Sequence, residues 1–331
     1  MDEIKKDALL SVRHLTVEYT SEGEVIHAVN DVSFELEKGK TIGLVGETGA
    51  GKTSIAKAIL RILPEPPARV KSGEIWFEGR ELLGLKEEEM RKIRGKNISM
   101  IFQDPMTALN PIMRIGEQIA EVIRLHEKCG KAQSVQKAKE MLEMVGIPGE
   151  RYYEYPHQFS GGMKQRVVIA MALACAPDLL LADEPTTALD VTIQAQVLDM
   201  INELKERLNT SMIMITHDLG VVAQVCDSVA VVYAGEVMEY GTKEQIFDHP
   251  LYPYTKGLFG SLPNMNDDAE RLSPIEGLPP NPADLPKGCT FHPRCPYAAE
   301  ACKQAHIPLT DMGGGHLCRC CRVSEIAKEG K

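Results

Sequence analysis

Short apolar runs without charged residues recur through the first three quarters of the chain. Examples are TIGLV at 41–45, LLLA at 179–182 and the run at 211–216. Runs of this length and composition predict buried strands. The segments between them, such as 54–63 and 163–175, place apolar residues at helical spacing. Strands that alternate with helices predict an α/β fold with a parallel sheet at its core.

Other parts of the chain follow different patterns. Residues 9–45 alternate and contain the turn signals SEGE and EKGK, which predict an antiparallel sheet. Residues 104–176 are mostly helical by pattern, with helical spacing at 112–128 and 134–146. A further strand-like run spans 228–239. After about residue 245 the periodicity is lost and prolines accumulate, which predicts an extended linker or tail. These prolines stand at positions 250, 253, 263, 274, 279, 280, 282 and 286.

Composition narrows the possible classes of protein. The 331 residues are 44% hydrophobic, enough for a sizeable core, and the net charge of −10 disfavours non-specific binding to nucleic acid or anionic membranes. Pro177 and Asp178 interrupt the longest apolar segment, so no stretch is long enough to span a bilayer. The start, MDEIKKDALL, lacks the apolar segment of a secretory signal. We therefore expect a cytoplasmic protein.

Residues 46–53, GETGAGKT, fit the pattern of a phosphate-binding loop. The loop follows a predicted strand and precedes a predicted helix, which is the context that the motif requires. Its backbone N–H groups and the helix start would bind phosphate, Lys52 would reach the β- and γ-phosphates, and Thr53 would bind Mg²⁺. The predicted phosphate-binding residues are Gly46, Gly49, Ala50, Gly51, Lys52, Thr53 and Ser54.

Two carboxylates follow the apolar run at 179–182. At the end of a parallel strand, Asp183 can hold Mg²⁺ through water, and Glu184 can polarise an attacking water. A solvated acidic turn is the simpler interpretation. Four apolar residues before the pair and the turn PTTALD after it favour the functional one.

The sequence FSGGMKQR at 159–166 predicts a second anion site. Ser160, Gly161 and Gly162 precede a predicted helix, and small residues at a helix start can bind phosphate. A single nucleotide does not need two phosphate sites in one subunit. The second site would therefore bind the nucleotide of a second subunit. Up to about residue 245 the chain resembles the ATP-binding cassette (ABC) ATPases. The resemblance implies an α/β P-loop cassette in which two subunits enclose two ATP molecules.

The resemblance also assigns roles to single residues. Gln103 in IFQDP would contact Mg²⁺ and water, and His217 would contact the γ-phosphate, although a strand-end histidine is more often structural. Asp190, with Ala188 and Leu189, would belong to the loop that crosses the dimer interface. Tyr19 would stack on adenine, but an aromatic in a strand usually packs in the core.

The C-terminal part of the sequence indicates which group of ABC ATPases the chain resembles. HPLYPYTKGLF at 249–259 and GCTFHPRCPYAAEAC at 288–302 resemble the extension of oligopeptide/dipeptide and nickel importer ATPases. This implies an ATPase that powers import of di- or oligopeptides, at the cytoplasmic face of the membrane. Its partners would be a second, identical or different, ABC ATPase, two membrane permeases and an extracytoplasmic binding protein. The alternatives are a nickel or other small-solute importer, or a soluble ABC ATPase of DNA repair or translation.

Six of the nine cysteines lie within 33 residues, at 289, 295, 302, 318, 320 and 321. In a cytosolic protein such a cluster indicates metal before disulfides, and four thiolates can bind Zn²⁺ or a four-iron four-sulfur cluster. The resemblance implies the iron–sulfur cluster, with Cys289, Cys295 and Cys302 as ligands. It favours Cys320 as the fourth ligand and leaves Cys318 and Cys321 open. Cys129, Cys175 and Cys226 are predicted to be inert core residues.

The predicted organisation has three parts. Residues 1–245 form the cassette, with a helical subdomain at about 104–176. Residues 246–288 form a Pro-rich arm, and residues 289–331 form a Cys-rich metal-binding tail. The predicted cofactors are ATP, Mg²⁺ and the iron–sulfur cluster.

Overall fold

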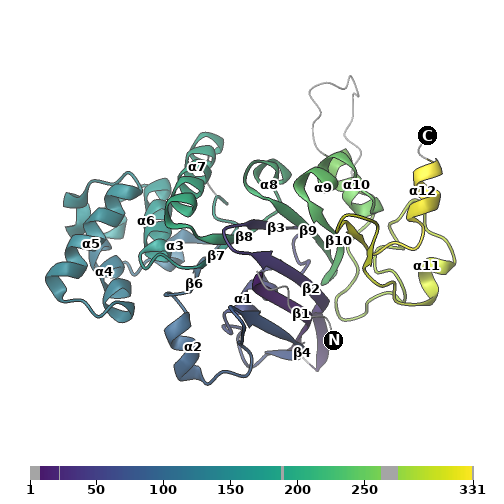
Figure 1. Cartoon of the computed structure of the whole chain (residues 1–331), viewed down its shortest axis with the longest axis horizontal. Helices are drawn as coiled ribbons and strands as arrows, with labels where there is room; N and C mark the ends of the chain where they lie inside the picture. The colour runs from purple at the N-terminus through teal and green to yellow at the C-terminus, as the bar shows by residue number, and fades with distance from the viewer. Residues whose placement is uncertain (1–7, 22, 188–189, 262–274, 330–331) are drawn as a thin grey trace. The chain divides into compact units, whose positions relative to one another are not determined.

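A computed structural model describes residues 8–21, 23–187, 190–261 and 275–329 (Figure 1). The chain divides into two compact units, each of which gathers segments far apart in the sequence. Unit 1 holds residues up to 10, 36–41 and 77–216. Unit 2 holds residues 11–35, 42–76 and 217–331. The units therefore do not follow the predicted boundaries at 245 and 288, which stay a prediction.

The centre of unit 1 is a parallel sheet of three strands in the order β8–β7–β6. The register pairs Ile98 with Leu179 and Leu179 with Ser211. Every residue of the three strands is buried, which explains why their sequences are nearly all apolar. The strands are β6 (Ile98–Ile101), β7 (Leu179–Asp183) and β8 (Ser211–Thr216). The predicted parallel core is confirmed here.

The predicted helical region of unit 1 is also confirmed. α4 and α5 pack side by side (Figure 1). Gly116 lets α4 lie against Tyr152, because a Cβ at this position would be 1.9 Å from the tyrosine ring. The helices are α3 (Pro105–Ala108), α4 (Ile115–His126), α5 (Lys131–Met144) and α6 (Gly161–Leu173), with the 3-10 turns Gly149–Tyr153 and Pro156–Gln158. Unit 1 also contains β5 (Arg80–Glu81), α2 (Glu87–Ile93) and α7 (Val191–Leu208).

Unit 2 contains a sheet in the order β11–β12–β10–β9–β3. β3 (Thr41–Val45) runs parallel to β9 (Ser228–Tyr233), and β9 forms an antiparallel hairpin with β10 (Glu236–Thr242). The strand-like run at 228–239 is thus two strands, which meet at Ala234 and Gly235, both with positive φ. A second sheet places β1 (Ala8–Ser21) between β2 (Glu24–Glu37) and β4 (Ala68–Phe77).

The C-terminal part is more regular than its sequence predicts. Residues 253–260, predicted to lie in an extended arm, form α10, which begins with Pro253 in its first turn. β12 pairs antiparallel with β10, so the tail adds to the sheet of unit 2. The remaining elements of unit 2 are α1 (Lys52–Ile59), α8 (Leu219–Val225), α9 (Lys243–Asp248), α10 (Pro253–Gly260), α11 (Ala301–Gln304), β11 (Thr310–Asp311), β12 (Leu317–Cys318) and α12 (Val323–Glu329).

Among the described residues, no helix combines the length and the apolar character needed to cross a membrane.

Candidate functional site

The phosphate loop lies between β3 and α1, as predicted. Gly46 has a φ of 152°, and a Cβ there would lie 2.0 Å from the carbonyl oxygen of Val232. Gly51 has a φ of 98°, and a Cβ there would lie 2.2 Å from the carbonyl oxygen of Ala28. A side chain fits at neither position, so the loop can lie directly against its neighbours only with glycine there.

The opposite side of the loop is open. Gly49 has a φ of 83°, and no described atom lies within 4 Å of the place where its Cβ would be. Lys52 is buried, and its Nζ donates to the carbonyl oxygens of Gly46 at 2.7 Å and Glu47 at 2.9 Å. The lysine is therefore folded over the loop, where it can reach phosphate.

Tyr19 lies beside this loop. Its hydroxyl is 3.2 Å from the Oγ of Ser54, in the first turn of α1. The structure thus brings together two predicted nucleotide-binding residues that are 35 positions apart. Stacking of the Tyr19 ring on adenine stays a prediction.

In unit 1, the predicted acidic pair lies at the end of β7. Asp183 is buried, and Glu184 has a φ of 47°, in the left-handed region. The Oε2 of Glu184 accepts hydrogen bonds from the Nε2 of Gln103 at 3.1 Å and the Oγ1 of Thr187 at 2.9 Å. Two predicted catalytic residues, Gln103 and Glu184, are therefore in direct contact.

The predicted signature sequence forms the start of α6. Ser160 is its N-cap, and its Oγ accepts a hydrogen bond from the backbone N–H of Met163 at 3.4 Å. Ser160 and Gly161 are exposed, and Gly162 is half-buried, so this helix start is accessible to an external anion.

The last two predicted residues lie at other element ends. Asp190 is exposed at the start of α7, while Ala188 and Leu189 lie outside the described residues. His217, in unit 2, is exposed and directly follows the last residue of β8. Contact of either residue with nucleotide stays a prediction.

Five of the six clustered cysteines line one pocket in unit 2. Apolar side chains, among them Phe291, Ile307 and Ile326, make up much of the remaining lining, which also includes His292 and Arg322. The Sγ atoms of Cys302 and Cys321 are 3.9 Å apart, and the Tyr252 hydroxyl is 3.1 Å from the Sγ of Cys289. The pocket cysteines are Cys289, Cys295, Cys302, Cys320 and Cys321.

The sixth cysteine, Cys318, lies buried in β12 and is not among the residues that line the pocket. Cys318 and Cys321 have the C-x-x-C spacing, but only Cys321 faces the pocket. Burial raises the pKa of the Cys295 thiol to about 11 and that of the Cys320 thiol to about 12. Within the described residues, no group of three or more His, Cys, Asp or Glu side chains converges as single-ion ligands would.

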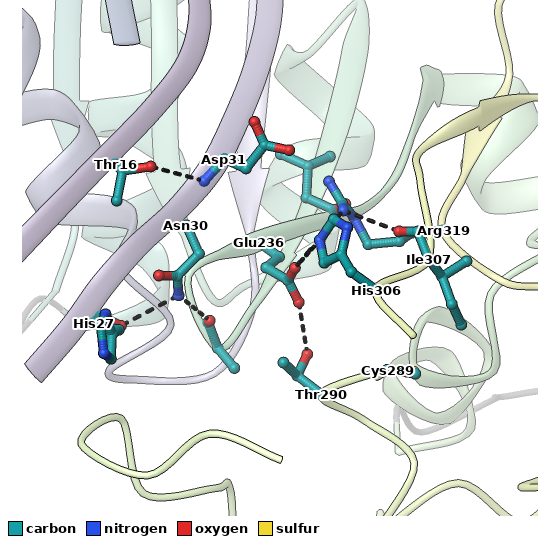
Figure 2. A network of polar contacts seen from close by, with 12 residues as sticks. Thr16, His27, Asn30, Asp31, Glu236, Cys289, Thr290, His306, Ile307 and Arg319 are labelled. Carbon is teal, nitrogen blue, oxygen red and sulfur yellow. Dashed lines mark hydrogen bonds and ion pairs between the residues drawn. The ribbon is translucent and has the colours of Figure 1, made fainter. Parts of the chain in front are cut away.

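Two buried glutamates of β10 connect it to this part of the chain, and Figure 2 shows one of them, Glu236. Glu236 accepts hydrogen bonds from the Oγ1 of Thr290 at 2.9 Å and lies 2.9 Å from the Nε2 of His306. Glu239 accepts from the backbone N–H groups of Leu251 and Tyr252, at 2.7 and 3.1 Å. Neither residue was predicted from the sequence. Their signal is two carboxylates in the otherwise apolar and aromatic run EVMEY.

Three further residues, not predicted from the sequence as site residues, meet at the phosphate loop, where Tyr254 and Arg294 both bond to Glu47. Glu47 lies in the phosphate-loop motif, but no motif connects it to Arg294, because 247 positions separate the two residues.

Unit 2 thus contains a phosphate loop in which glycines lie directly against neighbouring backbone and a lysine bonds to the loop carbonyls. Unit 1 contains an acidic strand end bonded to a glutamine, and a helix that starts with two glycines. These features define a P-loop nucleotide-binding ATPase of the cassette type.

Comparisons with known proteins agree with this class. Residues 29–187 match the family described as ABC transporter, and residues 238–302 match the family described as oligopeptide/dipeptide transporter, C-terminal region. The chain is 50% identical to the dipeptide transport ATP-binding protein DppD of Bacillus subtilis over 95% of its own length and 94% of the relative. It is also 50% identical to the oligopeptide transport ATP-binding protein OppD of Escherichia coli over 96% of its own length and 94% of the relative.

A solved structure shares the fold. A dimeric, post-hydrolysis form of the ATP-binding cassette MJ0796, bound to ADP and phosphate, matches with a TM-score of 0.64 at 25% identity. The match covers 71% of this chain and 98% of that one. The chain belongs to the ABC transporter ATP-binding proteins, in the group with the oligopeptide/dipeptide transporter C-terminal region. The fold and the family resemblance predicted from the sequence are confirmed.

Proposed function

We propose that this ABC ATPase powers the import of dipeptides and oligopeptides. The observation that supports the proposal most is the phosphate loop, with its glycine-walled backbone and buried Lys52, in a chain that also has the C-terminal region of peptide transporters. Relatives at 50% identity, matched over nearly their whole length, are named as dipeptide and oligopeptide transport proteins.

The predicted residues take the following roles in hydrolysis. Lys52 and the loop N–H groups bind the phosphates, while Thr53, Gln103 and Asp183 would hold Mg²⁺, which would neutralise charge on the phosphates. Glu184 polarises the attacking water, and Gln103, which donates to its carboxylate, keeps it oriented. His217 contacts the γ-phosphate, and Tyr19 stacks on adenine.

Two copies of the cassette, identical or different, would enclose two ATP molecules. Ser160, Gly161 and Gly162 would bind the nucleotide of the opposite cassette, together with Asp190. The exposure of Ser160 and Asp190 supports this arrangement, because both residues are accessible to a partner.

The helical region of unit 1 would bind the membrane permeases, which places the chain at the cytoplasmic face of the membrane. Large apolar side chains on this region are exposed to solvent: Ile112 is 83% exposed, Leu125 73% and Tyr153 53%. Aromatic side chains such as Tyr153 are enriched at protein interfaces.

The transported solute can be tested in the complex isolated from native membranes through a tag on this chain. With its binding protein added, ATP hydrolysis should rise with dipeptides or longer peptides and should not respond to nickel salts. Stimulation by nickel alone would favour the alternative importer. Isolation of the chain without any integral membrane subunit would favour the soluble ABC ATPase.

We also propose that the cysteine pocket holds a four-iron four-sulfur cluster. The donor set fits, because five thiols line one pocket whose other lining side chains are mostly apolar or aromatic. A cluster of four irons needs thiolates spread around it, whereas a single Zn²⁺ needs them to converge. Cys289, Cys295 and Cys302 are the proposed ligands, with Cys320 favoured over Cys321 as the fourth.

This second proposal is tested by anaerobic purification and metal analysis. The full chain should contain iron and sulfide and absorb near about 400 nm, as thiolate-bound clusters do. Cys302→Ser should remove most of the absorption, whereas Cys318→Ser, outside the pocket lining, should keep it. Stoichiometric zinc without iron would contradict the proposal.

A further inference from the structure

Glu47, the second residue of the phosphate loop, is held by three different groups. Its backbone N–H donates to the hydroxyl of Tyr254 at 3.0 Å, and its carbonyl oxygen accepts from Lys52. Its carboxylate accepts two hydrogen bonds from Arg294, at 2.9 and 3.1 Å. Two of the three groups belong to the C-terminal extension, which the mechanism of hydrolysis does not otherwise use.

Arg294 is held in place for this contact. Its side chain is only 6% exposed, and its Nε donates to the carbonyl oxygen of Glu276 at 3.0 Å. Its guanidinium lies over the ring of Tyr233, 5.7 Å from the ring centre, and donates to the Tyr233 hydroxyl at 3.3 Å. A planar guanidinium fixed in this way fits a carboxylate with two parallel hydrogen bonds.

The backbone that presents Arg294 is rigid as well. The N–H of Arg294 donates to the carbonyl oxygen of Phe291 at 3.0 Å, which closes a tight turn. Phe291 is buried, with its ring 5.2 Å from that of Tyr233 and 5.4 Å from that of Tyr254. The aromatic cluster therefore fixes both groups that contact Glu47, Tyr254 and Arg294.

The negative charge of Glu47 would affect nucleotide binding if Arg294 did not pair with it. Its carboxylate is part of a loop that must receive a triphosphate, and an uncompensated negative charge there would repel the ligand. We propose that Arg294 is a positioning residue for the phosphate loop. It neutralises Glu47 and turns its carboxylate toward the extension, so the loop remains open to ATP. Nucleotide affinity thus depends on a residue near the C-terminus.

The proposal is tested by Mg–ATP binding to the purified full chain. Arg294→Gln should raise the dissociation constant about tenfold, because it leaves the Glu47 charge unpaired. Arg294→Lys keeps the charge but not the paired hydrogen bonds and should have an intermediate effect. Lys303→Met is the control, because it removes a different cation from the same extension. Lys303 pairs with the exposed Glu300, so its loss should leave the affinity for Mg–ATP unchanged.

The double variant Glu47→Gln/Arg294→Gln separates positioning from folding. If the charge of Glu47 is responsible, the double variant should bind Mg–ATP at least several times more tightly than Arg294→Gln. Loss of packing alone would weaken both variants equally and lower their melting temperatures together. Unchanged affinity in a folded Arg294→Gln protein would overturn the proposal, as would a double variant no better than the single one. The ATPase assignment itself would survive either result.

Discussion

At the residue scale, the predicted catalytic residue Glu184 combines local strain with hydrogen bonds. Glu184 has a φ of 47°, which is unusual for a residue other than glycine. Its backbone N–H donates to the carbonyl oxygen of Ile215 at 2.8 Å, and its side chain accepts from Gln103 and Thr187. Strained residues held by such contacts are common at active sites. The geometry therefore favours a functional role for Glu184 over a solvated turn.

Glu184→Gln tests that role. The amide keeps the shape but cannot act as a base, so ATP hydrolysis should fall about a hundredfold or more. ATP binding should persist, because the phosphate loop is unaltered. The measurement is ATP turnover in the complex that contains the partner subunits. Glu203→Gln, an exposed acid on α7, is the control and should hydrolyse ATP normally. Normal turnover in Glu184→Gln would exclude the residue as the catalytic carboxylate.

At the element scale, the sequence predicted most of the strands and helices that position the site. The buried runs of β3, β7 and β8 and the helix start at Ser160 each have a local signal, either apolar content or a motif. α10 and β12 have a weaker one. β12 is two residues long, and its place in the sheet depends on pairing with β10. The pairing with a distant strand specifies such a short element, and a local sequence pattern does not include that distant strand.

A buried charge in β1 provides a pH test of the smaller sheet of unit 2. Glu18 is buried beside Lys71 at 2.7 Å and Arg69 at 2.9 Å, both on β4. Hydrogen bonds from Lys71, and then from Arg69, lower the pKa of Glu18 below its ordinary value of 4.5. A lowered pKa stabilises the fold above the unfolded-state value, and this stabilisation is lost as the pH falls through the folded-state value.

Glu18→Gln should therefore reduce the free energy of unfolding most at neutral pH. The difference from wild type should begin to shrink as the pH falls below about 4.5, because the unfolded state then binds a proton at this carboxylate before the folded state does. It should be smallest below the lowered folded-state pKa, where both states are protonated. Denaturant unfolding between neutral and acidic pH measures the difference. Glu24→Gln, at an exposed position of β2, is the control. A difference that stays constant with pH would show that the charge of Glu18 does not stabilise the fold.

At the scale of the whole molecule, the sequence predicted a cassette followed by a separate tail. The structure groups the tail with residues 11–35 and 42–76, which include the phosphate loop. The contact of Glu47 with Arg294 and that of Glu236 with Thr290 connect distant parts of one unit. Their members lie in segments that the sequence assigns to different domains. Sequence motifs predicted the nucleotide site, but only the fold shows which distant residues contact the phosphate loop.

The proposed nucleotide site shared with a partner cassette also belongs to this scale, and Ser160→Arg tests it. The exposed N-cap of α6 would receive a bulky cation where the partner's γ-phosphate is expected. The mutant subunit should still bind ATP at its own phosphate loop, whereas ATP trapping should fail at the site built from its α6 and the partner's loop. Site-resolved trapping in dimers with one mutant subunit measures both. Gln136→Arg, at an exposed position of α5, is the control. Damage confined to the mutant's own phosphate loop would contradict the shared-site arrangement.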